Sequence, residues 1–138
     1  MQRHKVVLDT NLFIAAFFNK KSFSYKILDM AKRNEISLIV SDEILKEINH
    51  ILRNIKPNSS FKNKINLILK KAKLIKNIPK VKEIKKDSSD NKFLATAFAG
   101  KADFIISNDK HLLSLKKFYK IEILTPKNFL KKNKRKLI

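Results

Sequence analysis

A short apolar run that ends in a carboxylate, Lys5–Asn11, constrains this chain more than any other stretch. Residues 6–8 are three consecutive aliphatic side chains, as expected for a strand that is covered on both faces. Asp9 follows at once, and in open α/β sheets ligands bind just beyond the carboxyl ends of the strands. The run therefore predicts a buried first strand that places Asp9 at the edge of the sheet where ligands bind. A cap for the helix expected from Leu12 is the alternative role for Asp9.

The remainder of the chain alternates apolar strands with amphipathic helices, which predicts βαβ units and a parallel sheet with right-handed crossovers. We expect a single α/β domain over residues 1–130, because 138 residues make one domain and no internal repeat is visible. The lysine-rich residues 131–138 are expected to form a basic C-terminal tail. Further strands are predicted over 36–40, 102–107 and 121–124, an edge strand or extended segment over 74–81, and helices or helical turns over 12–18, 24–34, 43–54, 60–76, 88–100, 110–118 and 126–130.

The charge balance points to a polyanionic partner. The chain has 32 Lys and Arg against 12 Asp and Glu, a formal net charge of +20 at pH 7, which is far more than solubility requires. Nucleic acid is the first candidate, and the alternative is a compositional bias in which most lysines only solvate the surface. Membrane-surface binding is disfavoured, because the basic residues are spread through several elements instead of gathering on one amphipathic helix.

Composition also excludes several chemistries. The chain has no cysteine, so it offers no disulfide, thiolate metal site or cysteine nucleophile. The first apolar segment is far shorter than a signal peptide or a membrane span, and Asp9 interrupts it. We therefore expect a cytoplasmic protein that makes no membrane contact.

The few carboxylates occupy informative positions in a chain this basic. Asp9 follows the first strand, Asp90 opens a helix, and Asp109 follows the strand predicted over 102–107. Glu47 lies beside the apolar stripe of the helix after the second strand. Because the carboxyl ends of neighbouring parallel strands share one edge of a sheet, these acids converge if their strands are neighbours. Taken alone, an Asp after a strand is also a common helix cap.

A cluster of carboxylates repels itself and raises its own pKa values unless a cation neutralises it. Oxygen ligands without Cys or paired His select magnesium or manganese. Such ions activate water, hold a phosphodiester and stabilise charge on the attacking and leaving oxygens. The helix predicted over 60–76 has an apolar side and a basic side, and its lysines are candidates to hold the backbone of a nucleic acid. These lysines are Lys62, Lys70, Lys71 and Lys73.

Four segments carry the acids in order: Val7–Asn11, Ser41–Ile48, Asp90–Ala97 and Ile105–Leu113. Together they resemble the four motifs of PIN-domain ribonucleases, especially the prokaryotic toxin branch related to VapC. The resemblance spans residues 6 to about 130, nearly the whole chain. It implies a three-layer α/β/α PIN-like domain with a central, mostly parallel sheet, and an endoribonuclease activity that depends on Mg²⁺ or Mn²⁺.

The resemblance also assigns roles to residues by their position in the motifs. The catalytic and metal-binding acids correspond to Asp9, Glu47, Asp90 and Asp109. The supporting polar residues correspond to Thr10 and Asn11 beside the first acid and to Ser107 before the last. Two positions stay open, because Glu43 competes with Glu47 for the second acid, and Asp87 could assist or replace Asp90.

Proteins of this kind commonly form homodimers and are commonly inhibited by a cognate antitoxin, so the resemblance implies an RNA substrate, an antitoxin partner and a dimer. Phe17, Phe18 and Phe23 are candidates to line a groove for the dimer or the antitoxin. The rival prediction, from a different class, is a PIN-like protein that binds RNA without cutting it. A haloacid dehalogenase-like phosphatase is disfavoured, because it needs a second Asp where this chain has Asn11.

Overall fold

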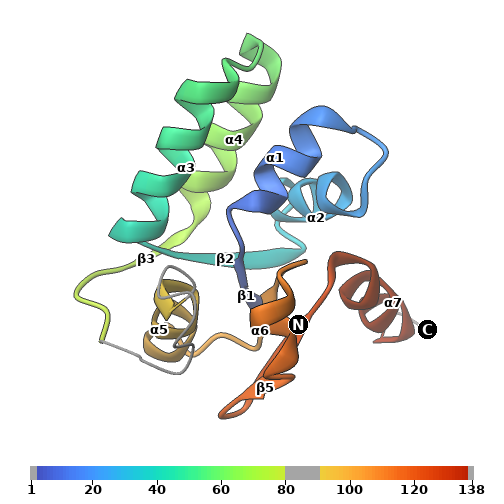
Figure 1. The fold of residues 1–138 in the computed structure, drawn as a ribbon. Coiled ribbons are helices and arrows are strands. Elements are labelled where there is room, and N and C mark those ends of the chain that lie inside the picture. The colour runs from blue at the N-terminus through green and yellow to red at the C-terminus, as the bar shows by residue number, and fades with distance from the viewer. Residues whose placement is uncertain (1–2, 80–90, 137–138) are drawn as a thin grey trace.

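A six-stranded sheet lies at the centre of the computed structural model, which describes residues 3–79 and 91–136, the last three by backbone alone (Figure 1). Its strands are β1 (His4–Leu8), β2 (Ile36–Ser41), β3 (Lys73–Ile75), β4 (Phe104–Ile106), β5 (Lys117–Phe118) and β6 (Ile121–Leu124). They lie in the order β3-β2-β1-β4-β6-β5, and every neighbouring pair is parallel except β5 with β6. The predicted central, mostly parallel sheet is confirmed.

Helices cover both faces of this sheet, as a three-layer fold requires (Figure 1). The helices are α1 (Asn11–Phe18), α2 (Phe23–Lys32), α3 (Asp42–Ile55), α4 (Ser59–Lys71), α5 (Asn91–Ala99), α6 (Lys110–Ser114) and α7 (Pro126–Lys136). On one side α2 packs against α1, α4 and α7, and on the other side α5 packs across β1, β2 and β4. Figure 1 also shows α3 and α4 projecting together away from the sheet.

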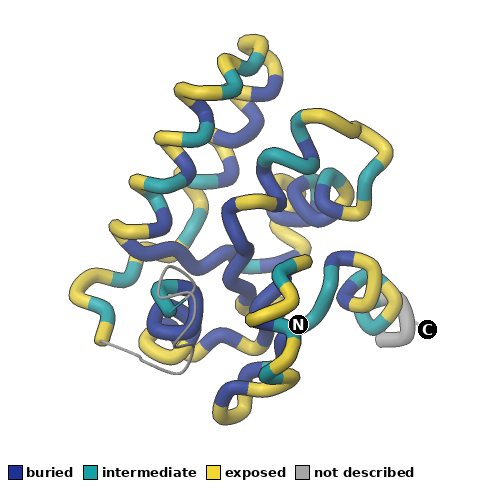
Figure 2. The backbone as a smooth tube through the Cα atoms, in the orientation of Figure 1, coloured by how far each residue is buried: buried dark blue, intermediate teal, exposed yellow. Residues whose placement is uncertain are grey.

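The middle of the sheet is buried on both faces. Residues 6–8 of β1 and 104–106 of β4 are all buried, as expected for apolar strands between two helical layers. The same core cluster contains aromatic rings from four helices, Phe13 of α1, Phe61 of α4, Phe93 of α5 and Phe129 of α7. Figure 2 shows this buried centre, with exposed backbone mainly along the outer helices and turns. The prediction of a buried first strand is confirmed.

Two predicted helices are shorter than expected. The helix predicted over 60–76 ends at Lys71, because Ala72 adopts an extended backbone and the edge strand β3 follows directly. The helix predicted over 110–118 ends at Ser114, because the chain turns there to form β5 against β6. Sequence periodicity missed both ends, since lysine and aliphatic residues are compatible with either conformation.

The C-terminal helix is longer than expected. α7 continues to Lys136, so most of the predicted basic tail is helical in its backbone, and the division of the chain at residue 130 stays a prediction. No helix in the described part of the chain has the length and apolar character needed to span a lipid bilayer.

Candidate functional site

Strand pairing places two polar residues side by side at the carboxyl edge of the sheet. In the parallel pair of β1 and β4, Leu8 lies opposite Ile106, so the next residue of each strand, Asp9 or Ser107, reaches the same edge. The Ser107 hydroxyl donates a hydrogen bond to Oδ2 of Asp9 at 2.6 Å and accepts one from the N–H of Asp109 at 2.9 Å. Ser107 therefore links the two acids that follow β1 and β4.

Asp9 is a buried carboxylate, with only 3% of its surface exposed. Its Oδ1 accepts a hydrogen bond at 3.0 Å from the N–H of Asn11, the first residue of α1. Burial raises the pKa of Asp9, the hydrogen bonds from Ser107 and Asn11 oppose this shift, and the negative charges of Asp109 and Glu47 add to it. The N-cap residue of α1 is Thr10, without a side-chain cap bond, so Asp9 is not the cap itself, although its Oδ1 satisfies the first N–H of the helix. The carboxylate also lies within electrostatic range of two other acids.

Glu47 reaches this edge from α3, which starts directly after β2, the neighbour of β1. The Thr10 hydroxyl donates a hydrogen bond to Oε1 of Glu47. Glu43 lies about one turn earlier on the same helix, with an exposed side chain. Because Thr10 is the residue next to Asp9, its contact favours Glu47 over Glu43 as the second acid.

Asp109 is the N-cap of α6. Its Oδ1 accepts hydrogen bonds from the backbone N–H groups of His111 at 2.7 Å and Leu112 at 3.3 Å. The side chain is half-buried, and its charge contributes to the raised pKa of Asp9. Asp109 therefore caps α6 and also lies close enough to Asp9 to affect its pKa.

Lys92 also belongs to this site, and sequence reasoning missed it. It lies in the first turn of α5, its Nζ is 2.5 Å from Oε2 of Glu47, and its side chain is only 12% exposed. The buried Thr96 hydroxyl holds α5 against the end of β2 by donating to the Ser41 hydroxyl at 2.8 Å. The available signal was the position of Lys92 two residues after Asp90, inside the third motif.

Two of the predicted acids, Asp87 and Asp90, lie outside the described residues. Within the part of the chain that is described, no three Asp, Glu or His side chains are close enough to form a ready metal site. The donor chemistry nevertheless suits a hard divalent cation, because three described acids offer carboxylate oxygens to one edge. A cation placed there would also relieve the repulsion that contributes to the raised pKa of Asp9.

Residues 5–111, which include three of the four predicted acids in described positions, match the family model of the PIN domain. The chain belongs to the PIN-domain family. An uncharacterized protein of Methanocaldococcus jannaschii is 36% identical to this PIN domain, over 91% of this chain and 89% of that protein. The family predicted from the four motifs is confirmed.

Two solved structures share the fold of this PIN domain. One is the crystal structure of VapBC2 from Rickettsia felis, bound to a DNA fragment from the VapBC2 promoter. It matches with a TM-score of 0.58 at 17% identity, and the match covers 86% of this chain and 96% of that chain. PAE2754 from Pyrobaculum aerophilum matches with a TM-score of 0.58 at 13% identity and covers 93% of this chain and 88% of that chain. These matches confirm the α/β/α PIN-like fold class.

The lysines predicted to hold nucleic acid lie at different places on the PIN domain. Nζ of Lys71 donates to the carbonyl of Lys32 at 3.0 Å, at the end of α2, so Lys71 lies at the amino edge of the sheet, opposite Asp9. Lys62 borders a hollow of about 480 Å³ between α3 and α4, about 13.5 Å from Lys71 along the helix axis. The other two, also exposed, are Lys70 in the last turn of α4 and Lys73 at the start of β3. The four lysines therefore do not form one surface around the acids.

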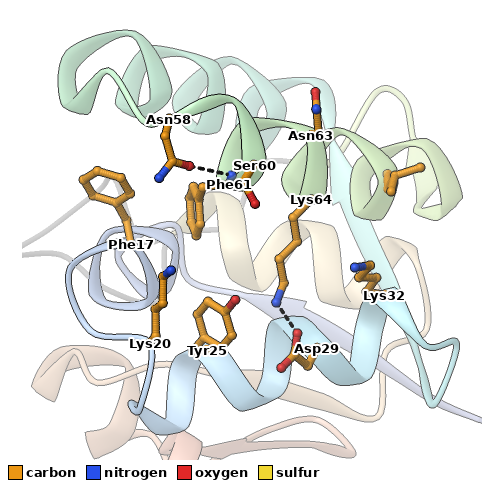
Figure 3. A pocket seen from close by; sticks show the side chains of 11 residues that line it. Phe17, Lys20, Tyr25, Asp29, Lys32, Asn58, Ser60, Phe61, Asn63 and Lys64 are labelled. Atoms are coloured by element: carbon orange, nitrogen blue, oxygen red, sulfur yellow. Dashed lines mark hydrogen bonds and ion pairs between the residues drawn. The ribbon is translucent and has the colours of Figure 1, made fainter.

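A separate hollow of about 390 Å³ lies between α1, α2 and α4 of the PIN domain (Figure 3). Lys64 reaches into it, where its Nζ pairs with Oδ1 of Asp29 and lies 3.7 Å from the ring centroid of Tyr25. At its other end the rings of Phe17 and Phe61 are 5.3 Å apart between centroids. None of the described acids of the candidate site lines this hollow.

Proposed function

We propose that this PIN domain is a Mg²⁺- or Mn²⁺-dependent endoribonuclease that hydrolyses phosphodiester bonds in RNA, and that it is the toxin of a toxin–antitoxin pair. The observation that carries the proposal is the Ser107 hydroxyl, which orients the Asp9 carboxylate and contacts the N–H of Asp109. A buried carboxylate next to other acids is costly to keep, and such perturbed groups concentrate at sites of chemistry.

The acids that would hold the metal are Asp9, Glu47, Asp109 and, from the sequence, Asp90. When bound, one or two divalent ions would activate water and stabilise the charge that develops on the phosphate. The protein's own contribution is orientation: Ser107 fixes Asp9 from one side and the N–H of Asn11 fixes it from the other. Thr10 holds the Glu47 carboxylate by a donated hydrogen bond. These contacts fix where the acids point before any ligand arrives.

RNA is the proposed substrate because the chain carries a net charge of +20, and because a polyanion releases counterions when lysines contact its phosphates. One observation favours the rival function, which is RNA binding without cleavage. Glu47, one of the few acids at this edge, is already paired with the Lys92 ammonium. Cleavage would require the metal to compete with that ammonium for the carboxylate.

An antitoxin protein is the proposed partner, by analogy with the VapBC2 assembly of Rickettsia felis. The surface we assign to it is the hollow between α1, α2 and α4, together with the exposed ring of Phe18, which lies 5.0 Å from that of Phe17 in the hollow, and the exposed ring of Phe23 at the start of α2. A homodimer, a cytoplasmic location, and a domain over 1–130 followed by a basic tail over 131–138 complete the proposal.

Incubation of the purified chain with mixed RNA and Mn²⁺ tests the nuclease. Wild type is expected to cleave, and cleavage should fall below detection in Asp9→Asn or when a chelator replaces Mn²⁺. Glu47→Gln and Glu43→Gln form a matched pair on α3, of which only the first should lose activity. Thermal unfolding of each variant checks that it folds. Equal cleavage by wild type and Asp9→Asn would refute the proposal, and RNA binding without cleavage would support the rival function.

A further inference from the structure

Three aromatic rings meet on the surface at the end of the molecule opposite the acids. Tyr119 lies in the turn between β5 and β6, and its ring centroid is 4.9 Å from that of Phe98 at the end of α5 and 4.7 Å from that of Phe118. Phe118 is buried, whereas Tyr119 and Phe98 are 72% and 46% exposed. The buried ring therefore anchors two exposed rings, which we call the aromatic pair, Phe98 and Tyr119.

A tight turn holds the backbone of Tyr119. β5 and β6 are joined by a tight turn of two residues, Tyr119 and Lys120, because Phe118 pairs with Ile121. Tyr119 has a φ of 57°, in the left-handed region where such turns favour Gly, Asn or Asp. A bulky aromatic residue in this region carries a strain of about 1 kcal/mol or more. Five other non-glycine residues in the described part of the chain also have a positive φ, so what distinguishes Tyr119 is that its ring remains 72% exposed beside that of Phe98.

Three lysines lie within a few residues of the aromatic pair along the chain. Lys101 follows Phe98 closely, since its N–H donates to the Phe98 carbonyl at 3.3 Å. Lys120 is the second residue of the turn that carries Tyr119. Lys116 lies just before β5, where its carbonyl accepts from the N–H of Ile123 at 3.0 Å, and all three lysines are exposed. The two acids nearest in sequence are engaged with other groups, since Asp103 accepts from the N–H of Lys5 at 2.8 Å and Glu122 pairs with Lys132 at 2.5 Å. The surroundings of the aromatic pair are therefore positively charged.

The aromatic pair is separate from the candidate active site. Glu122, the residue after Ile121, lies opposite Phe104, the first residue of β4. The aromatic pair thus sits near the amino end of β4, whereas Asp9 and Ser107 lie at its carboxyl end. In Figure 1 the β5 turn projects from the lower edge of the molecule, near α5. β4 is three residues long, so the two places are separated by at least about 10 Å.

We propose that the aromatic pair, with Lys101, Lys116 and Lys120, is a stacking site for an unpaired base of single-stranded RNA, outside the acidic site. Exposed aromatic rings beside basic side chains bind single strands, because every base offers a π-face for stacking and lysines hold the adjoining phosphates. The inference rests on the proposed function for the choice of RNA as the ligand. The stacking site would bind the RNA strand at a distance from the bond that is cleaved.

A second copy of this chain is the other occupant that exposed aromatic rings could accept. In a twofold dimer the same patch faces itself, which would bring three lysines of one copy against the same three of the other. Like charges brought together in this way oppose association. A nucleic acid supplies the opposite charge, so the charge pattern favours RNA.

Binding of a fluorescein-labelled oligoadenylate to the full chain, measured by anisotropy in EDTA so that no cleavage occurs, tests the site. Tyr119→Ala and Phe98→Ala should each weaken binding by about tenfold or more, the loss expected when one stacked base is released. Tyr119→Phe should bind like wild type, because it keeps the ring. Leu74→Ala, which trims an exposed apolar side chain on β3, should also bind like wild type.

Tyrosine fluorescence gives a second readout. The chain has two tyrosines and no tryptophan, so Tyr25→Phe leaves Tyr119 as the single reporter. Oligoadenylate should quench this emission, and a double-stranded RNA of the same length should quench it less. Unchanged affinity in Tyr119→Ala would overturn the inference, as would a wild-type dimer that Tyr119→Ala dissociates without loss of RNA affinity. If the protein cleaves RNA but oligoadenylate does not quench Tyr119, the stacking site is refuted and the proposed nuclease function stands. If oligoadenylate quenches Tyr119 but the protein does not cleave RNA, the stacking site stands and the proposed nuclease function is refuted.

Discussion

Lys92→Met should strengthen binding of Mn²⁺ by the RNA-free protein. In the structure the Lys92 ammonium lies 2.5 Å from Oε2 of Glu47, where it takes the place of a cation at one of the proposed metal ligands. Methionine keeps most of the aliphatic stem and removes the charged Nζ, which also lies 4.9 Å from the ring centroid of Phe93. The variant therefore tests the electrostatic competition and leaves the packing largely unchanged.

The size of the effect follows from the distances and the exposure of the pair. The 2.5 Å contact joins single atoms, whereas the charges spread over the ammonium and the carboxylate, so their centres are farther apart. Two unit charges about 4 Å apart interact by about 4 kcal/mol at an effective dielectric constant of 20. The Glu47 side chain is 34% exposed, so solvent screening lowers this to about 1–2 kcal/mol. Removing Lys92 should then tighten Mn²⁺ binding by about tenfold. The same change should lower the free energy of unfolding of the metal-free protein, because Glu47 then faces Asp9 and Asp109 without a counter-charge.

Calorimetric titration with Mn²⁺ in the absence of RNA measures the affinity, and urea unfolding in EDTA measures the stability. Lys132→Met is the matched control, because Lys132 makes a pair of the same length with Glu122, away from the acids. It should leave the Mn²⁺ affinity unchanged. If Lys92→Met binds Mn²⁺ no more tightly than wild type while Lys132→Met behaves as expected, the competition inferred from the ion pair is refuted.

Two further predictions concern Asp9. Ser107→Ala removes the donor to Oδ2 of Asp9 and the acceptor for the N–H of Asp109, so urea unfolding should show a loss of about 2–4 kcal/mol; an unchanged midpoint would show that water replaces the hydroxyl. Because the folded protein raises the pKa of Asp9 above its ordinary value of 3.8, the folded state binds this proton more tightly, and stability in EDTA should fall as pH rises from about that value through the raised pKa. Asp9→Asn should remove this part of the pH dependence, and identical profiles for the two proteins would contradict the assignment.

The parts of the fold that the sequence predicts well are those decided locally. The aliphatic runs of β1 and β2 and the alternation of strands with helices are determined by which residues avoid water, so they can be read along the chain. The order of the strands cannot be read in this way. The convergence of Asp9 with Asp109 depended on β1 being the neighbour of β4, and only the paired register of Leu8 with Ile106 establishes it.

The positions of the lysine side chains could not be predicted from the sequence. Helical periodicity indicates which face of a helix a lysine occupies, but not which edge of the sheet that helix end approaches. Lys71 therefore looked equivalent to Lys62 in the sequence and lies at the amino edge in the structure. Lys92 was missed for a related reason, since a long side chain has many possible partners, and its pairing with Glu47 depends on the approach of α5 to α3.

The contact between Ser107 and Asp9 ties the orientation of the carboxylate to the alignment of two strands. A slip of β4 by one residue against β1 would turn the hydroxyl to the other face of the sheet and leave the buried acid without its donor. Mutations that loosen the packing of Val7 or Ile105, deep in the core, should therefore disturb the site without touching it. A design that transfers this site to another protein should therefore keep the ends of β1 and β4 together in their paired register.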